Sequence, residues 1–294
     1  MAPDDHERLA RIALTYLTAS GDQHIHQQVT TDGAVATYQQ TIQVGHGWQR
    51  TAHVRRARIA LRADTCRSII PGDPDWPTTL DRLADLTAHT GTGDGRHAPP
   101  LALWVTGTAD LSTLLHRAVT ITGSRAATAY GHHVTTDITT GCAQDGWTVV
   151  AGGNFGIDAA AHRAALAADT PTIVIVPGGL DRLHPAAHHP LFDRISTRGL
   201  LISEAPPGTE VTRRRFIARQ RLLAAVTAGT VLVEAAARTT YPFAAIAAAV
   251  ALGRPAMAVP GPVTSAQSTG CHLMLRDPRV HLVTNATDVL THLR

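Results

Sequence analysis

The amino-acid sequence predicts an α/β protein in which a doubly wound, mainly parallel sheet is preceded by a small helical N-terminal domain. From residue 118 onward, short apolar runs alternate with longer amphipathic stretches. Continuous apolar runs are typical of strands that are buried on both faces, and the intervening helices cover those faces. Because such sheets bind ligands beyond the carboxyl ends of their strands, we expect the functional site there.

The predicted elements follow each other in regular order. The strands are Leu101–Val105, Val119–Thr122, Thr148–Ala151, Thr172–Val176, Leu200–Ser203, Thr230–Val233, Ala256–Val259 and Val280–Val283. The helices are Tyr130–Asp145, Ile157–Ala168, Arg213–Val226, Phe243–Leu252 and Ser268–Arg276. Most strands are thus joined through a helix, which is the usual connection between parallel strands.

The first part of the chain predicts a helical domain over residues 1–62, ahead of an α/β domain over residues 63–294. Within Glu7–Leu17 the apolar side chains recur at the spacing of one helix face. The polar stretch that follows has only weak periodicity. Five arginines then occur within Arg50–Arg62, and either a DNA contact or a solvated helix face accounts for them.

The composition excludes several classes of protein. Hydrophobic residues make up 44% of the chain, which is ordinary for a globular protein and excludes a disordered one. Apolar runs such as Ala244–Leu252 fall far short of the ~20 residues of a bilayer span, and the acidic start does not match a signal peptide. We therefore expect a cytoplasmic protein that does not contact membranes. Cys66, Cys142 and Cys271 are too widely spaced for a disulfide framework or a zinc cluster.

The formal net charge is only +3, so clustering of cations must carry any argument for a polyanionic partner. No lysine occurs, and all 26 basic residues are arginines. The densest cluster is Arg213–Arg221, where five of nine residues are arginines and an aromatic residue lies among them. This pattern suits single-stranded nucleic acid, with a solvated basic helix as the alternative. At helical spacing, Arg214 and Arg221 are expected to project toward the same crevice as Arg125, with Gln220 beside them.

The loop after the first strand of the alternation contains Gly123, Ser124 and Arg125. The glycine permits close backbone approach, the hydroxyl and guanidinium groups bind phosphate, and the next helix adds a positive N-terminus. Together they predict an anion site, with a tight turn and a solvent-facing arginine as the alternative. The loop matches neither common nucleotide-binding motif, and without lysine we do not expect an ordinary ATPase. The glycine-rich segment Thr90–Arg96 follows no buried strand and predicts a surface loop.

The loop after the next strand contains Gly152 and Gly153, which are expected to expose backbone N–H groups. In the helix that follows, Asp158 and His162 lie four residues apart and form either an acid–base pair or a helix-surface hydrogen bond. The histidines of His184–His189 lack carboxylate or cysteine partners at ligand spacing, so we expect no metal site.

The order of these turns resembles that of the DprA/SMF (DNA-processing protein A) family, and of its actinobacterial branch in particular. No single motif is decisive, but the ordered set is specific. The matching segments are Pro71–Pro77, Gly123–Arg125, Gly156–Asp158 with Ala161–His162, Pro206–Gly208, Arg219–Leu223, Val259–Pro262 and Ser268–Gly270.

The resemblance implies an extended Rossmann-like fold and a protein that is not an enzyme. Members bind single-stranded DNA without sequence preference, protect it during natural transformation and recombination, and load the recombinase RecA onto it, usually as homodimers. No cofactor, metal or catalytic residue is implied. Arg125 resembles the main phosphate ligand. The complete predicted DNA-binding set is Gly123, Ser124, Arg125, Gly152, Gly153, Phe155, Arg214, Arg219 and Arg221.

The chain departs from the family pattern at several positions. Phe155 stands where many members have a basic residue, and it is expected to stack on a base instead. Gln220 replaces the asparagine of an Arg-Asn-Arg motif, and Thr239-Thr240 replaces a Ser-Gly pair. The winged-helix domain found at the C-terminus of many members is expected to be absent.

Two other functions remain open. The first is a nucleotide-binding sensor or a nucleotide-hydrolysing enzyme of the related Rossmann-like superfamily. Hydrolases of that group resemble Pro-Gly-Gly-x-Gly-Thr followed by a catalytic glutamate, whereas Pro177–Gly179 is followed here by Leu-Asp-Arg. The second is a scaffold that does not bind DNA and acts through partner proteins.

Overall fold

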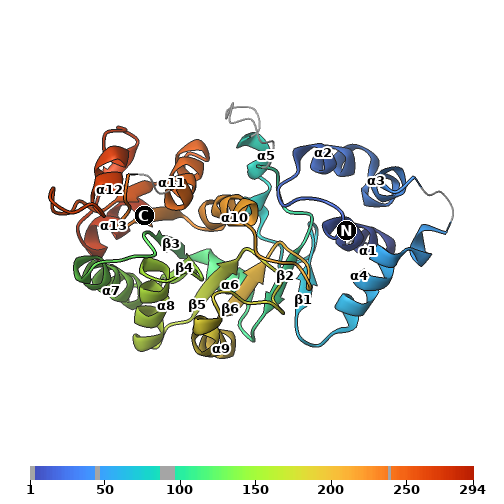
Figure 1. Ribbon diagram of the computed structural model, residues 1–294, viewed down its shortest axis with the longest axis horizontal. Helices are drawn as coiled ribbons and strands as arrows, with labels where there is room; N and C mark the ends of the chain where they lie inside the picture. The colour runs from blue at the N-terminus through green and yellow to red at the C-terminus, as the bar shows by residue number, and fades with distance from the viewer. Residues whose placement is uncertain (1–3, 44–46, 87–96, 238–239) are drawn as a thin grey trace.

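One mixed sheet organises the larger part of the molecule (Figure 1). The computed structural model describes residues 4–43, 47–86, 97–237 and 240–294. Within these residues nine strands lie in the order β1-β2-β6-β5-β4-β3-β7-β8-β9. They are β1 (Arg67–Ile69), β2 (Leu103–Thr106), β3 (Ala118–Thr122), β4 (Thr148–Gly152), β5 (Thr172–Val176), β6 (Leu200–Ser203), β7 (Gly229–Leu232), β8 (Ala256–Ala258) and β9 (Val280–Leu282).

The strand order reverses next to β3. From β3 the chain adds β4, β5 and β6 on one side, then returns to add β7, β8 and β9 on the other, and these seven strands are parallel. Only β1 and β2 extend the described sheet with antiparallel pairs. The doubly wound, mainly parallel, Rossmann-like sheet expected from the sequence is confirmed. Its switch point lies between β3 and β7, where ligands of such sheets bind.

Helices cover both faces of the sheet (Figure 1). One face packs against α7 (Ala129–Gln144), α8 (Ile157–Ala167), α9 (His189–Arg198) and α13 (Ala286–Leu293). The other packs against α5 (Leu83–Leu86), α6 (Leu111–His116), α10 (Arg213–Val226), α11 (Thr240–Ala251) and α12 (Thr269–Met274). Short 3-10 helices are η1 (Trp48–Arg50), η2 (Thr78–Leu80) and η3 (Ala186–His188).

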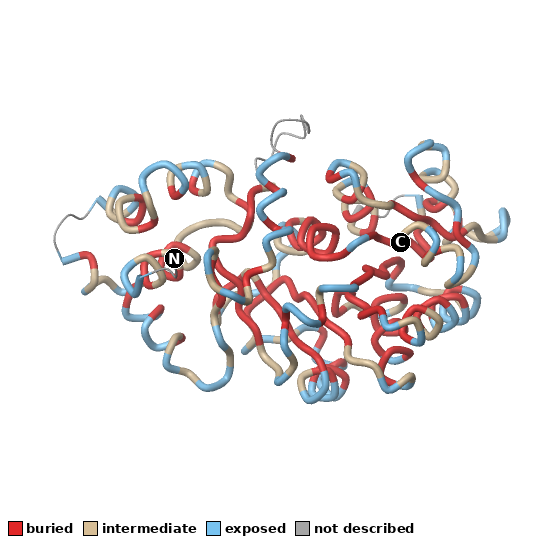
Figure 2. The backbone as a smooth tube through the Cα atoms, turned by 180° about the vertical axis from the view of Figure 1, so that it is seen from behind, coloured by how far each residue is buried: buried red, intermediate tan, exposed pale blue. Residues whose placement is uncertain are grey.

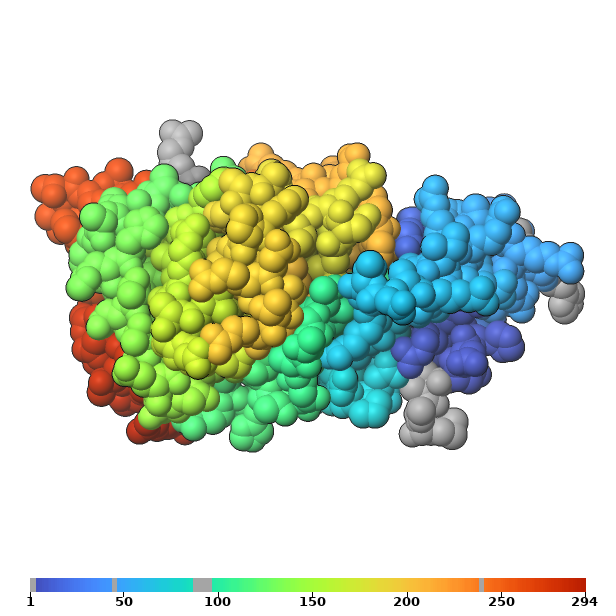
Figure 3. Space-filling view, turned by 90° about the horizontal axis from the view of Figure 1, so that it is seen from below, coloured from blue at the N-terminus to red at the C-terminus, as the bar shows by residue number. Residues whose placement is uncertain are grey.

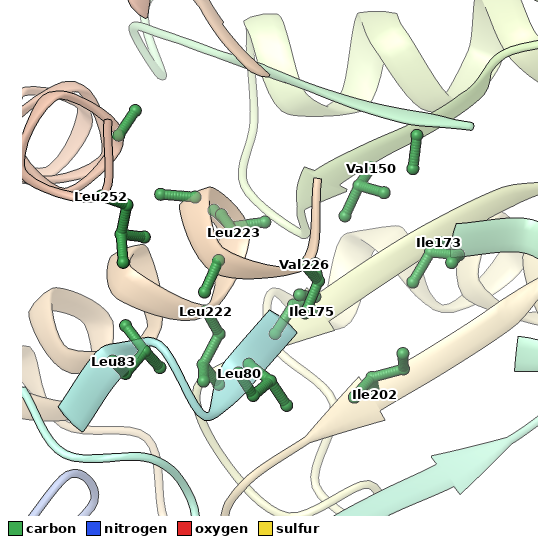
Figure 4. Packing of buried hydrophobic residues seen from close by; sticks show 14 of the residues in the cluster. Leu80, Leu83, Val150, Ile173, Ile175, Ile202, Leu222, Leu223, Val226 and Leu252 are labelled. Atoms are coloured by element: carbon green, nitrogen blue, oxygen red, sulfur yellow. The ribbon is translucent and has the colours of Figure 1, made fainter. Parts of the chain in front are cut away.

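Side chains of the central strands alternate between the two faces, as the period of a strand requires. Ile173 and Ile175 enter the core beneath α10, where Ile175 lies close to Leu222 and Val226 (Figure 4), whereas Val174 belongs to the core beneath α8 and α9. The central strands are consequently buried along their whole length (Figure 2). This two-sided burial explains why they read as continuous apolar runs.

The N-terminal helices lie at the end of the sheet beyond β1 (Figures 1 and 3). They are α1 (Asp5–Thr15), α2 (Gln23–Asp32), α3 (Ala34–Thr41) and α4 (Ala52–Arg62). Capping side chains begin three of them: Asp4, Asp22 and Thr51 accept N–H groups of the first turns of α1, α2 and α4. Their shared core also contains Trp104 of β2. Because this core includes residues on both sides of residue 62, the division into two domains at that residue stays a prediction.

Several elements were not anticipated from the sequence. Among them are β1, an edge strand of three residues, and the helices α6, α9 and α13. The predicted loop Thr90–Arg96 lies outside the described residues, as does Thr239. Within the described part of the chain, no helix has the length and apolar composition that crossing a membrane would require.

Candidate functional site

A crevice of about 420 Å³ opens beyond the carboxyl ends of β3 and β7, at the switch point of the sheet. Four parts of the chain line it: the β3–α7 loop, the β4–α8 loop, the first half of α10, and the segments around α11 and α12. The lining residues are Thr122, Gly123, Ser124, Arg125, Ala126, Asn154, Arg213, Gln220, Ala236, Tyr241, Pro242 and Gln267. Three predicted site residues, Gly123, Ser124 and Arg125, thus meet in one hollow.

A glycine joins two of these loops. Gly156 has φ of +73°, and a Cβ atom there would lie 2.7 Å from the carbonyl oxygen of Arg125. The N–H of Ile157 also donates to the carbonyl oxygen of Ser124 at 3.1 Å. Any larger residue at 156 would be strained and would push the loops apart. The Gly-Ile-Asp segment therefore supports the backbone that carries Arg125.

A second contact ties the β3–α7 loop to the segment after β7. The N–H of Ser124 donates to the carbonyl oxygen of Glu234 at 2.6 Å, and a Cβ on Gly123 would lie 2.7 Å from that oxygen. The Ser124 hydroxyl accepts the N–H of Ala126 at 3.1 Å. Ser124 is buried and shapes the loop by this local bond.

The N-terminus of α7 is already occupied by a protein carboxylate. Buried Glu234 accepts the N–H of Thr128 at 2.9 Å and its hydroxyl at 2.6 Å. Gly131 leaves room for this carboxylate, because a Cβ there would overlap it. Glu234 thus places a negative charge of the protein at this helix N-terminus, where it competes with an external anion, and anion binding by the helix N-terminus stays a prediction. Positive charge at the crevice also comes from arginine side chains.

Two exposed arginines supply that positive charge. Arg125 extends from the β3–α7 loop and Arg213 from the first turn of α10, and both line the crevice. Among the described residues, neither forms an ion pair or a side-chain hydrogen bond. Guanidinium groups without a counter-ion are suited to bidentate binding of phosphate.

The orientation of α10 differs by one residue from the sequence-based expectation. Arg213 and Gln220, seven residues apart on one face, line the crevice, whereas exposed Arg214 does not. One residue along a helix corresponds to a rotation of about 100°. The sequence pattern of five arginines lacked an apolar face clear enough to set this rotation. Arg213 was missed for this reason. Three lining residues from other segments, Asn154, Tyr241 and Gln267, were also not selected from the sequence.

Arg221 does not project toward the crevice, and that expectation is wrong. Its side chain is 3% exposed and forms a bidentate ion pair with Glu204, with distances of 2.9 and 2.7 Å. Its Nε also donates to the carbonyl oxygen of Ala98 at 3.0 Å. Glu204 accepts the N–H of Gly21 at 3.0 Å. Arg221 thus links α10 to the N-terminal helices.

Arg219 is also buried, beneath the β4–α8 loop. Its Nη1 donates to the carbonyl oxygen of Ile175 at 3.0 Å, while its Nε and Nη2 have no hydrogen-bond partner in the described residues. Burial lowers the pKa of Arg219, and the charge of Asp158 opposes that change. A Cβ on Gly152 would lie 2.6 Å from Nη2. Gly152 is buried and makes room for this arginine, so the expectation that its N–H group lies exposed is wrong.

Asp158 and His162 act separately. The Asp158 carboxylate accepts the Thr122 hydroxyl at 3.1 Å and the Asn154 side-chain N–H at 2.8 Å. Burial raises the pKa of Asp158, with Arg219 opposing the change. His162 contacts the Thr172 hydroxyl and the Gly152 carbonyl oxygen, each at 2.9 Å. Neither an acid–base pair nor a direct hydrogen bond between these two described side chains is present, and both are buried structural groups.

Phe155 follows the lining residue Asn154 on the β4–α8 loop but does not itself line the crevice. Its side chain is 47% exposed, and one edge packs on the His188 ring at a centroid distance of 4.5 Å. His188 in turn contacts the carbonyl oxygen of Gly153 at 3.0 Å. Gly153 itself is buried, since a Cβ there would lie 2.9 Å from the Phe192 ring, so its expected exposure is also wrong. The loop thus presents a fixed aromatic surface to solvent.

The described lining of the crevice supplies groups that can bind an anion or a base. It contains two arginines, amides, hydroxyl groups and Tyr241, but no carboxylate, histidine or cysteine. A doubly wound α/β protein with a cationic crevice at its switch point is the class that fold and site define.

Comparison with known proteins assigns the family. The family model for DNA recombination-mediator protein A matches residues 67–294, and the chain belongs to this family. It is 45% identical over 228 residues to a "Putative DNA processing protein DprA" of Mycobacterium tuberculosis, which covers 76% of this chain and 57% of that protein. It is 34% identical over 191 residues to DprA of Streptococcus pneumoniae, covering 65% and 66%. The chain therefore spans just over half the length of the mycobacterial relative.

Solved structures show the same fold. The DprA structure of Streptococcus pneumoniae aligns with a TM-score of 0.78 at 24% identity, over 100% of this chain and 99% of that one. DprA of Helicobacter pylori, described for its single-stranded DNA binding mode, aligns with a TM-score of 0.64 at 23% identity, over 78% and 95%. The DprA/SMF resemblance inferred from the sequence is confirmed.

Proposed function

We propose that this protein binds single-stranded DNA without sequence preference, with the phosphates held at the switch-point crevice by Arg125 and Arg213. The observation that carries the proposal is the pair of exposed arginines that lack a counter-ion among the described residues and face one hollow. Phe155 and Tyr241 supply aromatic surfaces close to these cations, the combination typical of single-strand binding grooves. Contacts to phosphates and ring faces carry no base sequence information.

As part of this proposal, the protein binds DNA but does not catalyse a reaction on it. The absence of catalysis is supported by the described lining of the crevice, which contains no carboxylate, histidine or cysteine. Family membership and the single-strand binding mode of the Helicobacter pylori relative agree with a DNA-binding function. Protection of the strand, loading of RecA and action as a homodimer are parts of the same proposal, drawn from the family.

The test is titration of fluorescent oligo-dT with wild-type protein and with Arg125→Ala at several salt concentrations. We expect Arg125→Ala to weaken binding about tenfold or more and to make the log–log salt slope shallower by about 0.7 for each phosphate that the variant no longer neutralises. Arg163→Ala is the matched control, because Arg163 is exposed and has no partner among the described residues but lies on α8, away from the crevice. Equal effects of the two substitutions would contradict the proposal.

A second candidate is recognition of a free mononucleotide. A cavity of about 420 Å³ lies within the usual size range of small-ligand sites. Gln220 and Gln267 line it, and their buried side-chain carbonyl oxygens have no hydrogen-bond partner among the described residues, so a rotation of either side chain would let it accept the amino group of a base. Calorimetry with dTMP and dAMP distinguishes the candidates. Binding of either as tight as that of oligo-dT favours the sensor, and hydrolysis of either contradicts the absence of catalysis.

The proposals drawn from the family have their own tests. Sedimentation equilibrium across a concentration series should reveal a dimer. Assembly of purified RecA on oligo-dT coated with single-strand binding protein should accelerate when this protein is added. A monomer at all concentrations, or an unchanged RecA assembly rate, would remove that part of the proposal without affecting DNA binding.

A further inference from the structure

Helix α4 carries a row of arginines for which the described fold supplies no partner. Its buried face consists of Val54, Ala57 and Ala60, which pack in the N-terminal core. The opposite face holds exposed arginines without ion pairs or hydrogen bonds to any described residue, namely Arg55, Arg56, Arg58 and Arg62. Ile59 lies among them with 71% of its surface exposed. Uncompensated charge beside exposed apolar surface indicates a contact with something outside the chain.

One edge of α4 borders a groove of about 750 Å³. Arg56 and Ile59 of α4 and Tyr16 at the end of α1 line one wall. Arg182 and Arg215, from the loop after β5 and the first turn of α10, line the other. Figure 3 shows the corresponding notch between the N-terminal helices, in blue, and the segments that follow β5 and β6, in yellow and orange. The groove therefore runs between the N-terminal helices and the main body.

The charge of the groove favours a polyanion. Three arginines line it, and Glu210 is the carboxylate among its described lining residues. Arg182 and Glu210 approach to 3.5 Å, but both side chains are largely exposed, so water screens the pair strongly. Burial raises the pKa of Tyr16 to about 12, which keeps its hydroxyl uncharged. The wall from the N-terminal helices and the wall from the main body thus present cations, an aromatic ring and an exposed aliphatic side chain to the same groove.

The groove and the switch-point crevice both border the first turn of α10. Arg213 lines the crevice and Arg215 the groove, and only one residue separates them on the first turn of α10. The buried Arg221–Glu204 pair, with the Gly21 N–H on Glu204, fixes the N-terminal helices against α10. A strand that leaves the crevice across the start of α10 therefore meets a second cationic surface of defined position.

We propose that this groove is a second contact for the same single DNA strand. Arg56, Arg182 and Arg215 bind phosphates, while Tyr16 and Ile59 contact the bases that the first site does not hold. The proposal rests on the function proposed above. It assigns a binding role to α4 and makes the N-terminal helices determine how many nucleotides the protein covers.

The test compares oligo-dT of two lengths with a matched pair of variants. Lengths of about 4 and about 25 nucleotides fall at the low end and beyond the roughly 4–16 nucleotides that one single-strand module covers. Arg56→Glu reverses a groove charge. Arg58→Glu makes the same change on the same exposed helix outside the groove lining. Thermal unfolding of both variants should match that of the wild type, since neither side chain pairs with another described residue.

We expect Arg56→Glu to weaken binding of the long oligomer about fivefold or more and to lower the salt slope, with little effect on the short one. Arg58→Glu should change either affinity less than about twofold. Equal reductions in affinity from the two variants, or equal reductions for the two lengths, would overturn this inference while the crevice proposal stands. Failure of the wild type to bind either length would overturn both.

Discussion

The start and the middle of α10 carry the same residue type in opposite roles. In its first turn, exposed Arg213 has no partner among the described residues and faces an open crevice. Two turns later, Arg221 is buried against Glu204 and bonds to the backbone of another segment. Both belong to one run of arginines in the sequence. An arginine is left for a ligand where the fold brings no carboxylate to it, and it becomes part of the structure where the fold does.

The largest expected effect concerns the buried arginine. Arg221→Met removes one partner of a buried ion pair and leaves the Glu204 charge without compensation, which should lower the free energy of unfolding by about 3–5 kcal/mol. Arg213→Met changes an exposed side chain and should stay within about 0.5 kcal/mol of wild type. Urea unfolding measures both values. Comparable decreases would show that burial does not separate the two arginines.

For oligo-dT affinity we expect the reverse, with the exposed arginine contributing more than the buried one. Arg213→Met is expected to weaken oligo-dT binding about threefold to tenfold, because the variant neutralises one phosphate fewer. Fluorescence titration with the oligomer measures this change. The comparison breaks down if the variant binds as the wild type does.

The contrast between a buried and an exposed side chain also applies to two histidines, where it affects the pH dependence of the free energy of unfolding. Burial lowers the pKa of His162 from 6.5 to about 4, whereas His133 lies exposed on α7. The unfolded chain takes up a proton at residue 162 below about pH 6.5, which the folded chain resists until about pH 4. The contribution of neutral His162 to the free energy of unfolding is therefore complete above pH 6.5 and diminishes as the pH falls toward 4. At about 1.4 kcal/mol per pKa unit it amounts to about 3 kcal/mol.

The variant His162→Gln should remove that part of the pH dependence of the free energy of unfolding between about pH 7 and about pH 5, and His133→Gln should leave it unchanged. Urea unfolding at the two pH values measures the difference. A slope that persists in His162→Gln would mean that another group is responsible.

A smaller effect is expected at the start of α7. Glu234→Gln removes the charge that faces the helix N-terminus and one of two acceptors for Thr128, which should destabilise the protein by about 1–2 kcal/mol. Glu210→Gln is the exposed control and should have almost no effect on the urea unfolding that measures both. If Glu234→Gln has equally little effect on the free energy of unfolding, the Glu234 charge does not stabilise the N-terminus of α7. That N-terminus would then be open to an external anion.

Much of the fold could be predicted because its signals are local. The runs at Thr148–Ala151 and Thr172–Val176 are continuous and apolar since both faces of those strands are covered. β1 could not be predicted because three residues at a sheet edge carry no such pattern, and α9 begins in a stretch rich in histidine and proline. The glycine-containing loops were also placed correctly, because the ends of parallel strands meet at one edge.

The composition of the site needed more than local signals. The residues Gly123, Ser124 and Arg125 could be placed beside the switch point from sequence order alone. The rotation of α10 could not be predicted, because arginines occur on both its exposed and its buried faces. The buried roles of Gly152 and Gly153 depend on Arg219 and on Phe192, which approach them from distant parts of the chain.

By itself, the sequence determined the α/β class, the strands of the wound sheet and the loop that presents Arg125, since periodicity and chain order depend on neighbouring residues. Only the tertiary structure decided which arginines remain free, that Glu234 occupies the start of α7, and that α4 faces a groove. Those outcomes depend on which charges become neighbours in space, and charge pairing between distant segments leaves no periodic trace along the chain.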